Sequence, residues 1–161
     1  MKTRQFKLGP MDNFSYLLWN EGTKEAAVID PAWQPEKLEE FIKKEGLLLQ
    51  CVLLTHAHPD HVNGVAFFTR ANNSLPVYLH EADHFMLEGK PPKLLSVQDG
   101  EKIEAGTLRI GVLHRRRQAD RSLEVLNSLF HLPAMLKSEA EIIGGNGVVR
   151  LLLPRLFKNN K

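Results

Sequence analysis

Short apolar runs separated by polar turns fill the first two thirds of the chain. Residues 14–19 and 26–30 are two such runs, and the polar residues 20–24 between them include Gly22. A loop of this length that contains glycine, placed between two apolar runs, is typical of a hairpin. The pattern therefore predicts an antiparallel pair of strands near the start of the chain.

The periodicity then changes from that of a strand to that of a helix. Leu38, Phe41 and Ile42 recur at the i, i+3 and i+4 spacing, and charged residues fill the opposite face of residues 36–44. Pro35 stands where a helix commonly begins, because its fixed φ suits the first helical position. We expect an amphipathic helix that packs on the predicted strands.

A nearly unbroken apolar run, residues 47–54, follows Gly46 and predicts a strand buried on both faces. Strand, helix and strand in this order predict a βαβ unit, and with it an α/β layered fold (α and β elements in stacked layers). The same criteria predict further helices at residues 62–70 and 81–87 and further strands at residues 76–80, 102–104 and 108–114.

Composition agrees with one globular domain. The chain has 161 residues, of which 43% are apolar and 25% charged, which argues against disorder. It has no apolar run of about 18 residues, so we expect no membrane-spanning helix. The first ten residues are basic but lack the apolar core of a secretory signal, which favours a cytoplasmic protein. The single cysteine, Cys51, excludes an internal disulfide framework.

The candidate chemistry is concentrated directly after the apolar run 47–54. His56, His58, Asp60 and His61 place three imidazoles and one carboxylate within six positions. Side chains alternate along an extended backbone, so His56 and His58 can reach one cation, while Asp60 and His61 follow on a turn. Imidazole and carboxylate are the ligands that zinc prefers, with iron or manganese as alternatives. The segment predicts a metal site at the carboxyl end of a buried strand.

With these residues in view, the chain resembles the metallo-β-lactamase fold hydrolases. Residues 56–61 are similar to the His-x-His-x-Asp-His signature of that family, and their surroundings look most like the glyoxalase II-like (hydroxyacylglutathione hydrolase-like) branch. Weaker similarities lie at residues 13–17 (opening strand), 27–31 (a second strand, whose Asp30 supports the metal loop), 76–80 (the next strand) and 108–114 (the strand before the third ligand loop). The resemblance covers about residues 10–114.

The resemblance implies a four-layer αββα sandwich, of which this chain carries the first half. It also implies two metal ions, zinc in many members, with His56 and His58 holding one ion and Asp60 and His61 the other. Water acidified by the ions then attacks a thioester or another activated carbonyl of a small-molecule substrate, and Asp60 orients the water or relays its proton. A relative with the same ligands and iron would be a sulfur dioxygenase.

The similarity ends abruptly after His114. The family places a further histidine ligand where this chain has Gln118, and an aspartate that bridges both metals where Asn146 is the nearest equivalent. Residues 1–114 carry 12 Lys and Arg against 15 Asp and Glu, whereas residues 115–161 carry 9 against 4. We therefore divide the chain into the N-terminal part of a metallo-β-lactamase-like domain and a basic tail, residues 115–161.

Two explanations of the basic tail remain open. It is either a divergent functional segment or the product of a changed reading frame at about codon 115, which the nucleotide sequence would decide. In the second case the chain would be a truncated remnant that binds metal without catalysis. The basic residues then form a solvated segment, and we expect neither nucleic acid nor a membrane as partner. A half-covered sheet would favour self-association.

Overall fold

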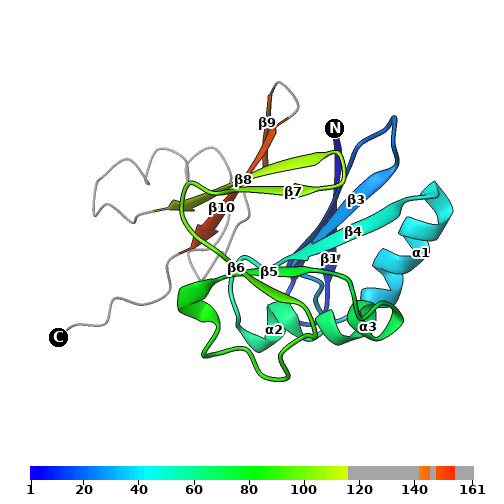
Figure 1. Cartoon of the computed structure of the whole chain (residues 1–161). Coiled ribbons are helices and arrows are strands. Elements are labelled where there is room, and N and C mark those ends of the chain that lie inside the picture. Colours follow the sequence, from blue (N-terminus) through cyan, green and yellow to red (C-terminus); the bar gives the residue numbers. More distant parts are fainter. Residues whose placement is uncertain (116–141, 146–147, 155–161) are drawn as a thin grey trace, which may run out of the picture.

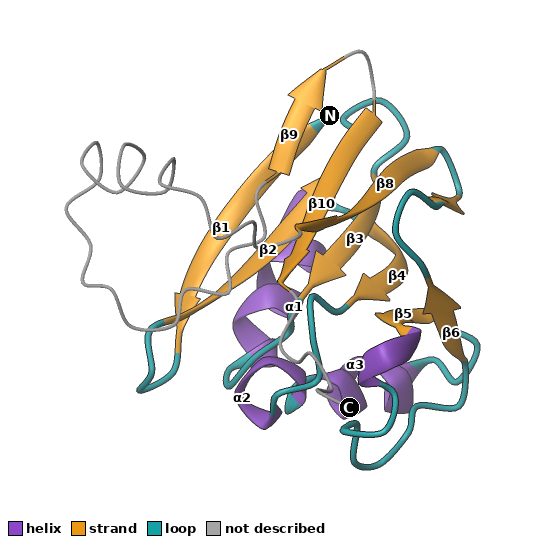
Figure 2. Cartoon of the chain, turned by 90° about the vertical axis from the view of Figure 1, so that its left-hand side faces the viewer, coloured by secondary structure: helices purple, strands orange, loops and turns teal. Residues whose placement is uncertain are grey.

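The computed structural model describes the backbone of residues 1–115, 142–145 and 148–154, and the side chains of residues 1–112. Two sheets pack against each other, and helices gather on one side of the first (Figures 1 and 2). None of the helices in these ranges is long and apolar enough to cross a membrane.

The first sheet has six strands in the order of the sequence. They are β1 (Lys2–Leu8), β2 (Asn13–Trp19), β3 (Glu25–Ile29), β4 (Leu48–Leu53), β5 (Val77–His80) and β6 (Leu94–Val97). The second sheet has the strand order β7-β8-β10-β9, with bounds β7 (Lys102–Ala105), β8 (Leu108–Arg115), β9 (Ile142–Gly145) and β10 (Val148–Pro154). The helices are α1 (Pro35–Glu45), α2 (Pro59–Val62), α3 (Val65–Ala71) and the 3-10 turn η1 (Glu81–Asp83).

The predicted hairpin and βαβ unit are both confirmed. β2 pairs with β3 in antiparallel orientation, and β3 pairs with β4 in parallel orientation across α1. Leu38 and Ile42 of α1 are buried, and the helix ends at Gly46, whose φ of 64° is the left-handed conformation that glycine adopts without strain. The prediction that β4 is buried along its whole length is wrong for its first half, where Leu48 is 57% exposed.

Alternating residues of the first sheet face two different cores. Val28 points to the core that contains Leu38 and Phe68 of the helices. Its neighbour Ile29 points the other way, to the core shared with Ile110 of the second sheet. Such alternation is what a sheet covered on both faces requires. Within the described residues the fold is therefore a helix, sheet and sheet sandwich, as expected for the first half of the αββα architecture.

The helical predictions around the candidate site are corrected in two places. The helix expected at residues 62–70 is two short helices, α2 and α3, because the chain bends at Gly64, whose amide donates to the carbonyl of Pro31 at 2.8 Å. The helix expected at residues 81–87 is only the turn η1. Met86 donates to the carbonyl of Asp83, an i to i+3 bond of a turn rather than of an α-helix.

Four strands, β1, β6, β9 and β10, were not predicted from the sequence. β1 is an edge strand, and residues 2–5, all of them charged or polar, are exposed, so it has no apolar run to reveal it. β6 has four residues and owes its conformation to parallel pairing with β5. β1 and β6 therefore depend on a neighbouring strand rather than on their own hydrophobic pattern.

The described part of the basic tail consists of Arg115, which ends β8, and the strands β9 and β10. β10 pairs with β8 in parallel orientation, with Val148 opposite Arg109 and Pro154 opposite Arg115. The division of the chain at residue 114 stays a prediction. Arg116, Arg117 and Arg121 of the basic tail lie outside the described residues.

Candidate metal centre

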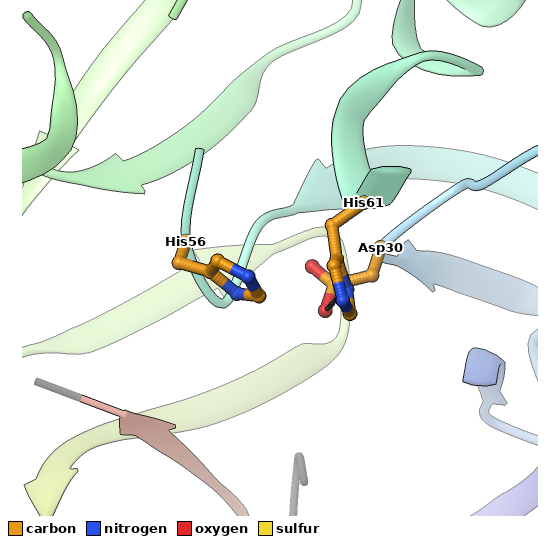
Figure 3. A group of neighbouring side chains, drawn as sticks. All are labelled: Asp30, His56 and His61. Carbon is orange, nitrogen blue, oxygen red and sulfur yellow. Dashed lines mark hydrogen bonds and ion pairs between the residues drawn. The ribbon is translucent and has the colours of Figure 1, made fainter. Parts of the chain in front are cut away.

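The histidine segment lies where β3 and β4 end together. Asp30 follows β3 directly, Thr55 and His56 follow β4, and His61 lies on α2. Because β3 and β4 are parallel, their carboxyl ends meet at the same edge of the sheet, the usual position of sites in α/β folds. Figure 3 shows Asp30, His56 and His61 gathered at this edge.

Three imidazole rings of the predicted site lie against one another. The ring centroids of His56 and His61 are 4.2 Å apart, and those of His56 and His58 are 4.7 Å apart. His56 and His61 are buried, whereas His58 and Asp60 are half-buried. The cluster thus has a buried side supported by the protein and a side that reaches towards solvent.

Asp30 supports the cluster from its buried side. Its backbone has a φ of 45°, and its amide donates to the carbonyl of Leu53 at 3.0 Å, which ties the turn to β4. The carboxylate accepts the Thr55 amide at 2.7 Å, the Thr55 hydroxyl, and Nδ1 of His61 at 3.1 Å. One buried carboxylate therefore fixes both the loop and one ring of the cluster.

These hydrogen bonds also determine which ring nitrogen carries the proton in His56 and in His61. The Thr55 hydroxyl gives its only proton to Asp30, so it accepts from Nδ1 of His56, which lies 2.8 Å away. His61 donates its Nδ1 proton to Asp30 directly. In the neutral form of both rings the lone pair is then on Nε2. A proton-donating contact at the other ring nitrogen is the usual arrangement of a metal-ligating histidine.

Burial and charge shift the pKa values of the cluster in opposite directions. Burial lowers the pKa of His56 to about 4, against the attraction of Asp30. For His61, burial also acts to lower the pKa, but the hydrogen bond and charge of Asp30, together with the charge of Asp60, outweigh burial and raise it. The pKa of Asp60 is lowered, because the hydrogen bond from Asn13 and the charge of His61 outweigh its partial burial.

The spacing of the donor atoms fits a metal ion. Oδ2 of Asp60 and Nε2 of His61 are 3.7 Å apart, within the span of two bonds of about 2.1 Å each. Asp30, His56 and His61 also offer ligand atoms within 4.8 Å of one another. Both carboxylate oxygens of Asp30, however, already accept hydrogen bonds, from Thr55 and from Nδ1 of His61. A candidate ion-binding face is therefore the one that carries Nε2 of His61 and Oδ2 of Asp60, with Asp30 on the opposite side of the ring.

The ligand set predicted from the sequence can now be compared with the structure. His56, His58 and His61 lie together and Asp60 lies beside His61, although which of them bind metal stays a prediction. Asp30 lies behind the rings, where the resemblance had placed it. Gln118 and Asn146 lie outside the described residues, as does the side chain of His114.

The sequence analysis missed three polar residues that hold the cluster in place. They are Asn13, Ser15 and Thr55, of which only Thr55 adjoins the histidine segment. The Ser15 hydroxyl donates to the carbonyl of Asp30 at 2.5 Å and accepts from the amide of Ala32 at 3.2 Å. Ser15 and Asn13 lie on β2, more than forty residues before the histidines, so no local pattern could have connected them to the site.

Comparison with known sequences finds a family and several similar proteins. The sequence profile of the Metallo-beta-lactamase superfamily matches residues 8–138. A probable metallo-hydrolase, YqgX of Bacillus subtilis (strain 168), is 36% identical over 81 residues, which are 50% of this chain and 37% of that protein. A hydroxyacylglutathione hydrolase-like protein of Gallus gallus is 40% identical over 67 residues, or 42% of this chain and 23% of that protein.

A solved structure shows the same architecture. The crystal structure of the BLEG-1 B3 metallo-beta-lactamase superposes with a TM-score of 0.58 at 31% identity, over 67% of this chain and 58% of that one. The matched segments span less than half the length of the two curated relatives named above. The similarity therefore concerns less than half of each of those two proteins.

Proposed function

Because the chain belongs to the metallo-beta-lactamase superfamily, we propose that it is a metal-dependent hydrolase of the glyoxalase II-like branch. Its substrate would be a small thioester or another activated carbonyl compound. The observation that carries the proposal is the cluster of His56, His58 and His61, in which Asp30 and Thr55 hold the Nδ1 protons of two rings. The similarity to a hydroxyacylglutathione hydrolase-like protein supports the thioester class.

In this proposal His56 and His58 hold one ion, and Asp60 and His61 hold a second. A donor set of imidazole nitrogens and one carboxylate suits zinc, and also iron or manganese. A bound ion supplies Lewis acidity, which acidifies water and polarises a carbonyl oxygen. The chain's own contribution is to hold Nδ1 of His56 and of His61 by hydrogen bonds, so that each of these rings offers Nε2 to an ion.

Asp60 has the catalytic role in the proposal. Its lowered pKa keeps the carboxylate ionised at neutral pH, and its partial exposure lets an oxygen face a water molecule. An ionised carboxylate can accept a hydrogen bond from that water and orient it towards a carbonyl carbon. His56, with its pKa of about 4, stays neutral and does not compete for the proton.

The test measures metal content and hydrolysis with the same purified chain. We expect bound zinc by elemental analysis, and hydrolysis of S-lactoylglutathione above a control of buffer and metal. A variant with His56→Ala and His58→Ala together should lose the metal and the activity. His84→Ala is the matched control, because His84 contacts the carbonyl of Leu79 and lies outside the cluster.

Each other outcome assigns a different function. Metal that binds without turnover would replace the hydrolase with a non-catalytic metal-binding remnant. Bound iron, with oxidation of a persulfide in place of hydrolysis, would assign the sulfur dioxygenase alternative. A chain that binds no metal under any of these conditions would refute the proposal.

A further inference from the structure

Asn13 contacts two of the proposed ligands from a different part of the chain. It is the first residue of β2 and is only 7% exposed. Its side-chain nitrogen, Nδ2, lies 2.7 Å from Oδ2 of Asp60 and 3.1 Å from the carbonyl oxygen of the same residue. The same nitrogen lies 3.1 Å from Nε2 of His61.

The neighbours of Asn13 determine which way its amide points. A carboxylate oxygen and a carbonyl oxygen both accept hydrogen bonds, so the atom facing them must be the NH2 group. Because that NH2 group can only donate, Nε2 of His61 must accept in the neutral ring. The contact thus places the lone pair of His61 on Nε2.

A second contact of His61 leads independently to the same assignment. Nδ1 of His61 lies 3.1 Å from Oδ2 of Asp30, a carboxylate that can only accept when ionised. The ring is therefore held at both nitrogens, with the proton on the side of Asp30 and the lone pair on the side of Asn13.

The other end of the Asn13 amide points to a role beyond packing. Its oxygen, Oδ1, is buried and has no hydrogen-bond partner among the described residues. An unpaired buried acceptor destabilises a fold, and such groups in native proteins call for an explanation. Leucine would fill a similar volume without this cost. We therefore attribute the amide at position 13 to the hydrogen bonds that its NH2 group donates.

We propose that Asn13 is a positioning residue of the metal site, which holds the Asp60 carboxylate beside Nε2 of His61 and gives up its contact with that nitrogen when an ion binds there. From β2, Asn13 donates to the main-chain and side-chain oxygens of Asp60, and a carboxylate oxygen that accepts such a bond keeps a second lone pair for an ion. The Asp60 oxygen thus stays 3.7 Å from Nε2 of His61, a separation that one ion can bridge. This inference rests on the metal binding of the proposed function. Partners of this kind set metal affinity through the geometry of the ligands they hold.

The test is a titration of the full chain with Co²⁺, followed by visible absorption and by competition with a chelator. The binding step that belongs to Asp60 and His61 is the one that Asp60→Ala removes. We expect Asn13→Ala and Asn13→Leu each to weaken that step at least about tenfold, the usual effect of losing such a partner. Asn13→Leu separates the effect of the amide group from the effect of side-chain volume, because leucine makes no hydrogen bonds but leaves no void.

Asn20→Ala is the matched control. Asn20 directly follows β2, and its amide donates to Thr107, far from the histidines, so Co²⁺ affinity should not change. Thermal unfolding of the metal-free variants shows whether they fold.

In addition, ¹⁵N NMR of the metal-free wild-type chain, at a pH where its imidazoles are neutral, should show Nε2 of His61 without a proton.

The outcomes separate this inference from the proposed function. If both Asn13 variants bind Co²⁺ as tightly as the wild type, or if Nε2 of His61 carries the proton, the role of Asn13 is wrong and the hydrolase proposal stands. If the wild-type chain binds no Co²⁺ at all, both fail.

Discussion

At the scale of single residues, Asp30 and His56 show how burial prepares the site before any metal arrives. Asp30 is nearly fully buried and has a left-handed backbone conformation, which is uncommon for residues other than glycine and better tolerated by aspartate than by most others. This turn brings its carboxylate to Thr55 and His61. The left-handed backbone of Asp30 therefore helps to orient two rings, that of His61 directly and that of His56 through Thr55.

The low pKa of His56 makes the stability of the metal-free chain depend on pH. The folded chain protonates His56 only at about pH 4, whereas the unfolded chain does so near 6.5. Between these values the unfolded state binds more protons, so stability is full above pH 6.5 and falls as the pH drops towards 4. The expected slope reaches at most about 1.4 kcal/mol per pH unit.

The measurement is thermal unfolding in the presence of a chelator, with His56→Gln as the comparison. The wild-type chain should lose stability more steeply than the variant between pH 6.5 and 4. His61 acts in the opposite sense, because its raised pKa stabilises the fold at low pH and that contribution is lost as the pH rises through it. Parallel curves for wild type and variant would contradict the assignment to His56.

At the scale of elements, the junction of α2 and α3 links the histidine segment to β3. Gly64 donates its amide to the carbonyl of Pro31, the residue after Asp30. A Cβ atom at position 64 would lie 2.4 Å from that carbonyl oxygen and 2.9 Å from its carbon. Only glycine allows this close approach, so the helices and the Asp30 turn are in direct backbone contact.

Gly64→Ala should therefore destabilise the fold by about 1–3 kcal/mol, the usual cost of an overpacked contact. The displaced Pro31 should also move Asp30, so metal affinity should fall in the same variant. Urea unfolding and chelator competition measure the two effects. Gly22→Ala is the control, since a Cβ there meets only the Asn20 side chain at 3.5 Å, and should change stability by less than about 0.5 kcal/mol. Equal effects of the two substitutions would exclude the close approach as the cause.

At the scale of the whole molecule, the candidate site connects elements that are distant in the sequence. Asn13 belongs to β2, Asp30 follows β3, His56 follows β4 and His61 lies on α2. An ion bound here would tie the edge of the first sheet to a helix that covers it. Metal binding should therefore stabilise the fold as a unit.

Zinc at about one hundred times its dissociation constant should raise the unfolding free energy by about 2.7 kcal/mol. For a chain of this size the melting temperature would rise by about 5–10 °C. Differential scanning calorimetry with and without zinc checks the shift, and excess chelator should reverse it. The variant with His56→Ala and His58→Ala provides the control, and an equal rise in that variant would show that zinc binds elsewhere.

Local patterns predicted much of the fold and the centre of the site. The spacing of Leu38, Phe41 and Ile42 predicted α1, because a helix repeats its faces every three to four residues. The composition of residues 56–61 alone predicted a metal-binding segment. The strands β1 and β6 were missed, because their conformation comes from hydrogen bonds to a neighbouring strand rather than from their own side chains.

The sequence by itself determined which side chains can bind a metal, because the chemistry of imidazole and carboxylate does not depend on the fold. Only the tertiary structure decided how those groups are held. Asn13, Asp30 and Thr55 meet the histidines because β2, β3 and β4 are neighbours in one sheet. Sheet pairing joins residues that are far apart in the chain, and the protonated nitrogen of each ring depends on those neighbours.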